Sequence, residues 1–320
     1  MDVLVHSERL DHSPDPHADP ALAAGGEAAL LPGRPPVYAH RGYSSQQPEM
    51  TVAAYRAAID WAAERQVPLG LECDVQLSAD EMLVCLHDLT LDRTAGVAAA
   101  VADTTLAELT SLDFGSWWLA EPREDQRKLT TLPHLLSMVA AARASGHEIT
   151  VAVETKHPNP HGLDVDAAVA RLLKLLGWDG PGSPVRIISF SAAALALDAV
   201  LLPGLPLTLL FDELGEWADG SLPAGVTAAG PSLAVLRADP GYVERAHAHG
   251  HEVHVWTVND PADIAWCTAL GVDAITTDYP HRLWQEADHA YPAVVTDSTE
   301  RPGRRSAAES AADARTSSAA

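Results

Sequence analysis

The chain has 320 residues and is strongly acidic, because 44 Asp and Glu against 21 Lys and Arg give a formal net charge of −23. Such an excess of carboxylates excludes a surface for nucleic acid or for an anionic membrane, since neutralising phosphates requires clustered Lys and Arg. Although 47% of the residues are hydrophobic, no apolar run approaches the roughly 20 residues of a membrane-spanning helix. The length permits either two average domains or one α/β barrel of about 250 residues.

The two ends are predicted to be disordered tails. Residues 1–35 are rich in Pro, Asp, His and Ala, and residues 291–320 finish in RPGRRSAAESAADARTSSAA. Neither end carries enough apolar surface to offset its chain entropy. The start lacks the basic and apolar segments of a secretory signal, and Cys73, Cys85 and Cys267 show no disulfide or zinc spacing. We therefore expect a cytoplasmic protein with one folded domain over residues 36–290.

Within this domain, short β-branched or aliphatic runs alternate with Ala-rich and Leu-rich stretches of helical period. Alternation of this kind predicts a parallel sheet covered by helices. In chain order the predicted strands are residues 37–40, 69–77, 82–87, 149–155, 185–190, 207–211, 226–230, 252–258 and 274–277. The predicted helices are residues 51–65, 132–145, 164–177, 191–201, 239–250 and 261–271.

The second and third predicted strands are joined too closely to be parallel. Only residues 78–81 separate them, whereas a parallel crossover needs about a dozen residues or more. They must form an antiparallel hairpin, and removing residues 82–87 from the parallel set leaves eight strands. The sequence therefore predicts a (β/α)₈ TIM barrel with a small insertion, about residues 88–131, after the second-strand hairpin.

Acidic side chains occupy the predicted carboxyl ends of two barrel strands, where the active sites of such barrels lie. Glu72 and Asp74 are two residues apart and share one face of their strand, and Glu154 follows in the next barrel strand. One carboxylate alone would be more typical of a helix cap or an ion pair. Three together indicate a site for a hard divalent cation, Ca²⁺ or Mg²⁺.

Two histidines lie beside this acidic group. His40 ends the first predicted strand and His87 ends the return strand of the hairpin, and imidazole exchanges protons near neutral pH. A two-residue turn at Ala79 and Asp80 would set His87 directly opposite Glu72. We predict that the two histidines form an acid–base pair, the alternative being that each is structural.

Arg41 and Lys156 add two cations to the same strand ends. A metal, two cations and two histidines suit a phosphodiester, because positive groups can hold the nonbridging oxygens while the histidines assist attack and departure. The alternative is that Arg41 and Lys156 only neutralise the carboxylates as ion pairs.

Eight segments in order make the chain resemble the glycerophosphodiester phosphodiesterase family, over residues 37–285. They are AHRG from Ala39, QPEMT from Gln47, LECDVQLSAD from Leu71, CLHDLTLDRT from Cys85, VETK from Val153, SF at Ser189, VWTVN from Val255 and GVDAITTDYP from Gly271. The resemblance implies a (β/α)₈ barrel that hydrolyses glycerophosphodiesters to sn-glycerol 3-phosphate and an alcohol.

Carried over residue by residue, the resemblance assigns a role to each matching position. It implies an acid–base pair in His40 and His87, a metal site in Glu72, Asp74 and Glu154, and phosphate contacts in Arg41 and Lys156. Glu49 would lie near the site as a partner of Arg41 or of the metal. Phe190 and Trp256 resemble the apolar wall against which glycerol packs, the alternative being that they are core aromatics.

One position departs from the family, and three questions remain open at this point. Met50 stands where the family usually has Asn, so the loop before residue 51 is expected to be held differently. The attacking oxygen is either water or the glycerol 2-hydroxyl. A lysophospholipase D-type enzyme would share the catalytic residues but would need an apolar groove for an acyl chain, to which Trp117 and Trp118 could contribute. A non-catalytic phosphodiester-binding module would lack one or more of the catalytic residues. The oligomeric state is not predicted.

Overall fold

The computed structural model describes residues 34–285. By its contacts the chain divides into residues 1–285 and residues 286–320, and only the first of these units contains described residues. Apart from residues 34 and 35, the predicted tails at 1–35 and 291–320 lie outside the described part, as do residues 286–290 of the predicted domain.

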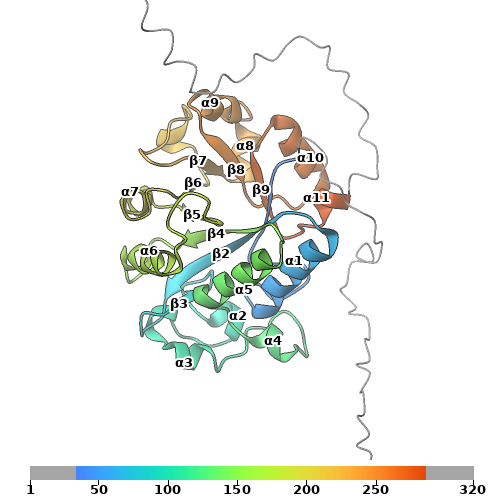
Figure 1. The fold of residues 1–320 in the computed structure, drawn as a ribbon, viewed down its shortest axis with the longest axis vertical. Coiled ribbons are helices and arrows are strands. Elements are labelled where there is room, and N and C mark those ends of the chain that lie inside the picture. The colour runs from blue at the N-terminus through green and yellow to red at the C-terminus, as the bar shows by residue number, and fades with distance from the viewer. Residues whose placement is uncertain (1–33, 286–320) are drawn as a thin grey trace, which may run out of the picture. The chain divides into compact units, whose positions relative to one another are not determined.

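The strands close into a parallel barrel (Figure 1). Their order is β1-β9-β8-β7-β6-β5-β4-β2, and pairing of β1 with β2 completes the ring. The strands are β1 (Val37–Ala39), β2 (Leu69–Leu77), β4 (Ile149–Thr155), β5 (Val185–Ser189), β6 (Leu207–Phe211), β7 (Ala228–Pro231), β8 (Glu252–Val255) and β9 (Ala274–Thr277), with β3 (Leu83–Cys85) paired only with β2. The predicted (β/α)₈ barrel is confirmed.

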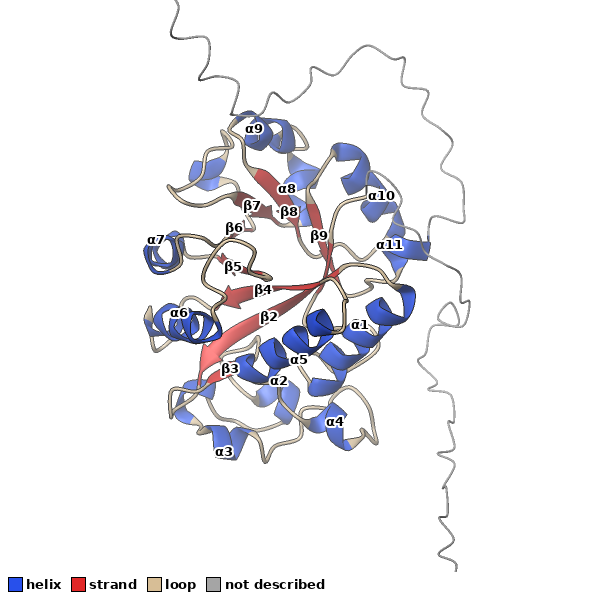
Figure 2. Cartoon of the chain, viewed as in Figure 1, coloured by secondary structure: helices blue, strands red, loops and turns tan. Residues whose placement is uncertain are grey.

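Helices cover the outside of the barrel strands (Figure 2). The larger ones are α1 (Val52–Arg65), α5 (Leu132–Ala144), α6 (Asp164–Leu176), α7 (Ala192–Leu201), α9 (Tyr242–Ala248) and α10 (Pro261–Leu270), and all six had been predicted. Two short ones, α8 (Leu233–Ala238) and α11 (Arg282–Gln285), had not. Between β6 and β7 the connection holds only a 3₁₀ turn, η3 (Gly215–Trp217). No helix of the described chain is both long and apolar enough to cross a membrane.

Strand β2 shows how the sequence divides between core and site. Every residue of β2 is buried, and successive side chains point to opposite faces. Leu69, Leu71, Cys73 and Val75 belong to the main hydrophobic cluster between strands and helices, so the intervening Glu72 and Asp74 face the barrel interior. Burial on both faces explains the nearly continuous apolar character of the run.

The hairpin register differs by one residue from the prediction. Val75 pairs with Cys85 and Leu77 with Leu83, so the loop has three residues rather than two. Its last residue, Glu81, has φ of 59°, which is the left-handed conformation that such loops place at this position. His87 is therefore not opposite Glu72, and β3 ends two residues before it.

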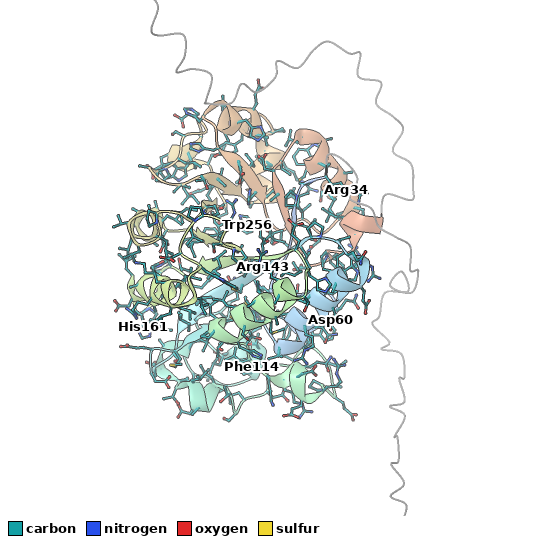
Figure 3. All side chains as sticks on the ribbon, viewed as in Figure 1. Arg34, Asp60, Phe114, Arg143, His161 and Trp256 are labelled. Carbon is teal, nitrogen blue, oxygen red and sulfur yellow. The ribbon has the colours of Figure 1, made fainter. Side chains whose placement is uncertain are left out.

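The predicted insertion forms a small unit with its own core. It contains α2 (Asp92–Ala95), η2 (Val101–Asp103), α3 (Leu106–Leu109) and α4 (Glu124–Arg127). Its hydrophobic cluster, separate from the main core, consists of Val84, Leu86, Leu91, Val101, Leu109, Phe114 and Leu129; Phe114 is labelled in Figure 3. The segment after His87 is thus a packed unit.

Candidate active site

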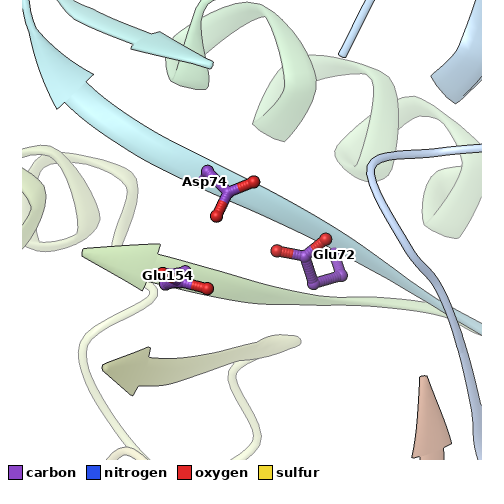
Figure 4. Close-up of side chains that lie close together, drawn as sticks. All are labelled: Glu72, Asp74 and Glu154. Carbon is purple, nitrogen blue, oxygen red and sulfur yellow. The ribbon is translucent and has the colours of Figure 1, made fainter. Parts of the chain in front are cut away.

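Three carboxylates meet inside the carboxyl end of the barrel. Glu72 and Asp74 project from β2 and Glu154 from the neighbouring β4 (Figure 4). Asp74 is the register partner of Glu154, and one oxygen from each of the three lies within 4.8 Å of the others. Their exposed fractions are 3%, 1% and 7% respectively. The structure thus brings together the three predicted metal ligands.

Crowding and burial change the acidity of this group. Burial, together with the charges of Asp74 and Glu154, raises the pKa of Glu72 well above its ordinary value. Burial and the charge of Asp74 raise the pKa of Glu154 to about 8. Burial also acts to raise the pKa of Asp74, but Lys156 and Arg41 outweigh it and lower that pKa. One carboxylate is therefore stable as an anion, and the other two need further positive charge.

The donor set fits a divalent cation. Oδ2 of Asp74 is buried and has no hydrogen-bond partner among residues 34–285. Three buried carboxylates that are all ionised repel one another unless positive charge lies between them. Hard cations such as Ca²⁺ and Mg²⁺ take carboxylate oxygens as ligands. Glu72, Asp74 and Glu154 would hold the ion.

Arg41 and Lys156 lie against the same carboxylates. The backbone N–H of Arg41 donates to Glu72 at 2.8 Å, and its side-chain Nε lies 3.4 Å from Oδ2 of Asp74. Nζ of Lys156 lies 3.2 Å from Asp74 and 2.8 Å from Glu154. Both cations thus form the ion pairs that the sequence had offered as an alternative.

Glu49 joins this network from the loop before α1. Its carboxylate accepts from Nη1 of Arg41 at 3.0 Å and from Nη2 of Arg93 at 2.7 Å. Burial acts to raise the pKa of Glu49, but the two arginines outweigh it and lower that pKa. Glu49 therefore remains anionic and holds the guanidinium of Arg41 in place. The sequence had offered two partners for Glu49, Arg41 or the metal, and the contact in the structure is with Arg41.

His40 is held by a carboxylate that the sequence prediction did not include. Its Nδ1 lies 2.7 Å from Oδ1 of Asp278, just after β9. Asp278 also accepts from Ser44 Oγ at 3.0 Å and from Asn259 Nδ2 at 2.6 Å. With Nδ1 directed to Asp278, Nε2 of His40 is the nitrogen that remains for a substrate.

His87 has the same arrangement within its own loop. Its Nδ1 lies 2.7 Å from Oδ1 of Asp88, and Nε of Arg93 donates to the other oxygen of Asp88 at 2.6 Å. Burial, with the charges of Arg41 and Lys156, lowers the pKa of His87, against the opposing effect of Asp74 and Asp88. The imidazole of His87 is therefore kept neutral at physiological pH.

Asp278, Asp88 and Arg93 are thus site residues that the sequence analysis did not single out. All three stand inside the quoted segments GVDAITTDYP and CLHDLTLDRT. Asp278 and Asp88 follow a strand end closely, and Arg93 lies in α2. A search for an acidic partner for each histidine among those segments would have found the two aspartates, because paired imidazoles commonly hold one nitrogen against a carboxylate.

The aromatic pair also meets. The rings of Phe190 and Trp256 lie 5.4 Å apart, edge to face, and Nε1 of Trp256 (Figure 3) donates to the carbonyl of Gly230 at 2.7 Å. Phe190 is 40% exposed. An aromatic side chain that is this exposed beside a polar site is better suited to contact a ligand than to fill the core. The position of Phe190 therefore suits the predicted apolar wall.

One cavity joins these groups. It measures about 230 Å³, and its lining includes every predicted site residue except Asp74 and Glu49. A second hollow shares His40 and Arg41 with it and is otherwise lined by loop residues, Ser44, Ser45, Glu49, Trp118, Asp278 and Tyr279. The site is therefore open to a ligand on two sides of His40.

Met50 is held in a strained conformation rather than loosely. Its φ is 61°, in the left-handed region where Asn is favoured among non-glycine residues. Its N–H donates to the carbonyl of Arg41 at 3.0 Å, and its carbonyl accepts from Thr130. These tertiary hydrogen bonds hold the backbone of Met50 in the left-handed conformation.

The chain is similar to known proteins over most of its length. Residues 40–282 match the model of the glycerophosphoryl diester phosphodiesterase family. A Mycobacterium tuberculosis protein, "Probable glycerophosphodiester phosphodiesterase 1", is 38% identical over 272 residues, which cover 82% of this chain and 96% of the relative. A glycerophosphodiester phosphodiesterase of Bacillus subtilis is 32% identical, with 82% and 89% covered.

Solved structures agree with the sequence matches. A phosphodiesterase of Oleispira antarctica in complex with the product sn-glycerol-3-phosphate has a TM-score of 0.68 at 27% identity, covering 80% of this chain and 97% of its own. A glycerophosphodiester phosphodiesterase from Agrobacterium tumefaciens has a TM-score of 0.63 at 25% identity, with 78% and 99% covered. Together with the barrel and its carboxylates, these matches show that the chain belongs to the glycerophosphoryl diester phosphodiesterase family.

Proposed function

We propose that this protein hydrolyses glycerophosphodiesters to sn-glycerol 3-phosphate and an alcohol, in a reaction that depends on a divalent cation. One observation carries the proposal. His40 and His87, each with Nδ1 against an aspartate at 2.7 Å, line the same cavity as Glu72, Glu154 and Lys156. Two oriented imidazoles beside an anionic cluster and a cation provide both proton transfer and phosphate binding.

In this proposal Arg41 and Lys156 bind the phosphodiester. Both pair with carboxylates in the structure. A divalent cation held by Glu72, Asp74 and Glu154, either Ca²⁺ or Mg²⁺, would supply the positive charge that offsets negative charge developing on the phosphoryl oxygens. With the carboxylates neutralised in that way, Arg41 and Lys156 are available to donate to nonbridging oxygens, and Glu49 keeps Arg41 in place.

His87 is proposed as the base and His40 as the acid. The lowered pKa of His87 keeps it neutral, so its Nε2 can accept the proton of the attacking oxygen as the new P–O bond forms. His40, which Asp278 holds at Nδ1, donates a proton from Nε2 to the departing alkoxide as the old P–O bond breaks. The attacking oxygen comes from water or from the glycerol 2-hydroxyl, and the appearance of a cyclic phosphate would identify the second route.

The cytoplasmic location predicted from the sequence remains part of the proposal. It is supported by Cys73, Cys85 and Cys267, which are all free and buried, because unpaired buried thiols are usual in a reducing compartment. Fractionation of the producing cells with an antibody to the chain tests it, and recovery outside the cytoplasm would contradict it.

The test of the activity is a panel of glycerophosphodiesters with a lysophospholipid, assayed with and without chelator. The wild type is expected to release sn-glycerol 3-phosphate only when a divalent cation is present. His40→Ala and His87→Ala are each expected to lower the rate by at least about 100-fold while the chain stays folded. Retention of more than a few per cent of the rate in either variant, or full activity after complete metal removal, would contradict the proposal.

A further inference from the structure

The active-site cavity extends down into the barrel, where it ends on polar side chains. Its lining includes Arg186 of β5, Thr208 of β6 and His254 of β8, all at inward positions of their strands. The interior of such a barrel is normally filled by branched apolar side chains. Three polar residues that line a cavity inside the barrel are therefore suited to bind a polar group of a ligand.

Strand register gives the depth of this floor. Glu154 of β4 pairs with Ile188 of β5, and Ala152 pairs with Arg186. Arg186 thus lies two residues nearer the amino ends of the strands than the level of Glu154, which is about 7 Å along a strand. The cavity runs from the carboxylates at the mouth to the guanidinium below them.

An apolar belt lines part of the cavity wall. Ala152, Ile188 and Leu210 form a cluster of their own inside the barrel, with Trp256 packed against it, and all four line the cavity. Ala152 is the register partner of Arg186 and Ile188 that of Thr208, so the belt lies directly beside the polar floor.

The floor is an ordered network without large excess charge. Nη1 of Arg186 donates to Thr208 Oγ1 at 3.0 Å, and Nη2 donates to Glu252 at 2.9 Å. The same carboxylate lies 3.0 Å from Nε2 of His254. Because Glu252 neutralises Arg186, the floor suits an uncharged group with hydroxyls better than a second anion.

One donor of this network is unused. Nε of Arg186 is buried and has no hydrogen-bond partner within residues 34–285, although the side chain is only 13% exposed. Buried donors are nearly always satisfied in folded proteins. The hydroxyl of Thr208, which accepts from Arg186, can still donate its own hydrogen. The oxygen of a hydroxyl group entering the cavity could accept from both of these donors.

We propose that the floor formed by Arg186 and Thr208 binds the terminal hydroxyl of the substrate's glycerol, the one farthest from phosphorus. This inference rests on the proposed function, which places the phosphodiester at the mouth. The carbon chain of the glycerol then lies against the apolar belt, and the terminal hydroxyl meets the polar floor. A glycerol acylated at that oxygen cannot place its chain there, so the floor selects deacylated substrates over lysophospholipids.

The second hollow is the place for the other alcohol of the diester. It is lined by loop residues after β1 and β9 and by Trp118 of the insertion, so it lies outside the ring of strands. A varied headgroup fits an outer hollow, whereas the constant glycerol fits one of fixed size within the barrel.

The test compares two ligands that differ only in the terminal hydroxyl, sn-glycerol 3-phosphate and 2-hydroxypropyl phosphate. Their dissociation constants are measured by calorimetry on the full chain with Mg²⁺ or Ca²⁺ present. The wild type is expected to prefer sn-glycerol 3-phosphate by about fivefold to tenfold, the range for one or two hydrogen bonds. Arg186→Met and the isosteric Thr208→Val should each bring the ratio close to one, while affinity for 2-hydroxypropyl phosphate stays unchanged.

Arg171→Met, at an exposed position of α6, is the matched control and should keep the wild-type ratio. An unchanged ratio in both floor variants would overturn the inference, and so would an equal fall in affinity for both ligands, which indicates a structural role. If Arg186→Met does not fold, Thr208→Val decides. Because binding is measured apart from turnover, a protein that shows the expected ratios but hydrolyses no glycerophosphodiester would contradict the proposed function and leave the floor assignment standing.

Discussion

Nδ1 of His40 lies 2.7 Å from Oδ1 of Asp278, a residue 238 positions later in the chain. The contact exists because β1 and β9 are neighbours in the barrel, so their carboxyl ends meet. A carboxylate in this position fixes the tautomer and orientation of the imidazole and stabilises its protonated form. Asp278 therefore positions His40 without needing to touch the substrate.

Asp278→Asn is expected to lower kcat by roughly 100-fold or more, since the amide cannot stabilise the imidazolium and favours the wrong tautomer. KM should change much less, because no phosphate contact is removed. Steady-state kinetics on glycerophosphocholine provides the measurement. Asp60→Asn, exposed on α1, serves as the control and should behave as the wild type; a kcat within threefold of wild type for Asp278→Asn would show that the contact has no role in turnover.

The acidic limb of the pH profile of kcat/KM is expected below pH 6.5. A base acts in its neutral form, and burial with Arg41 and Lys156 lowers the pKa of His87. Asp88 opposes that shift, so Asp88→Asn should move the limb to still lower pH while reducing the maximal rate. Asp92→Asn, at an exposed site nearby, should leave the limb where it is. Movement of the limb to higher pH in Asp88→Asn would contradict the assignment of His87 as the base.

A divalent cation is expected to stabilise the fold as well as support activity. An ion present at about 100 times its dissociation constant adds about 2.7 kcal/mol to the free energy of unfolding. Glu72→Gln should abolish most of this gain. In chelator the variant should unfold close to the wild type, because the pKa of Glu72 is already raised well above its ordinary value and the amide resembles the protonated acid. Thermal unfolding with EDTA, Mg²⁺ and Ca²⁺ measures the effect and ranks the two ions; an undiminished metal response in Glu72→Gln would remove Glu72 from the ligand set.

Asp198 provides a prediction away from the site. It is fully buried, and neither carboxylate oxygen has a hydrogen-bond partner in the described chain. Burial and the charge of Asp166 raise its pKa to about 7, against the opposing effect of His157. The folded state therefore holds a proton that the unfolded state releases near pH 4, and stability falls as pH rises from about 4 to 7.

Asp198→Asn removes this titration. The variant should gain about 1–3 kcal/mol in free energy of unfolding at pH 8 and little or nothing at pH 4.5. Urea unfolding at the two pH values measures the difference between them. A gain of the same size at both would mean that packing, and not ionisation, sets the effect.

The sequence was sufficient for the barrel because the strands are compact apolar runs and most of them alternate with helical segments. The hairpin followed from loop length alone, since four residues cannot make a crossover. Its register did not, because one left-handed residue, Glu81, adds a position to the turn. Helix α8 was missed because Leu233–Ala238 is too short to establish a helical period.

The site was predictable where strand position fixes a residue. Glu72, Asp74 and Glu154 follow from alternation on two neighbouring strands. Asp278 was not singled out because its contact with His40 depends on how loops from strands far apart in the chain meet. Asp88 is the sequence neighbour of His87, but whether its side chain turns towards the imidazole depends on the conformation of their loop. Met50 shows the same limit, since its left-handed backbone depends on hydrogen bonds to Arg41 and Thr130.

The separate core of the insertion has a consequence for how the protein responds to heat. His40 and the carboxylates stand on the closed barrel, whereas His87 stands beyond β3, which pairs only with β2. Leu83 and Cys85 of β3 pack in the main core, but Val84 and the following Leu86 pack in the seven-residue cluster of the insertion. A cluster of that size opens at a lower free energy than the barrel does. Moderate warming should therefore abolish activity reversibly, because the insertion opens and His87 leaves the site. The barrel should still give its full circular dichroism signal at these temperatures.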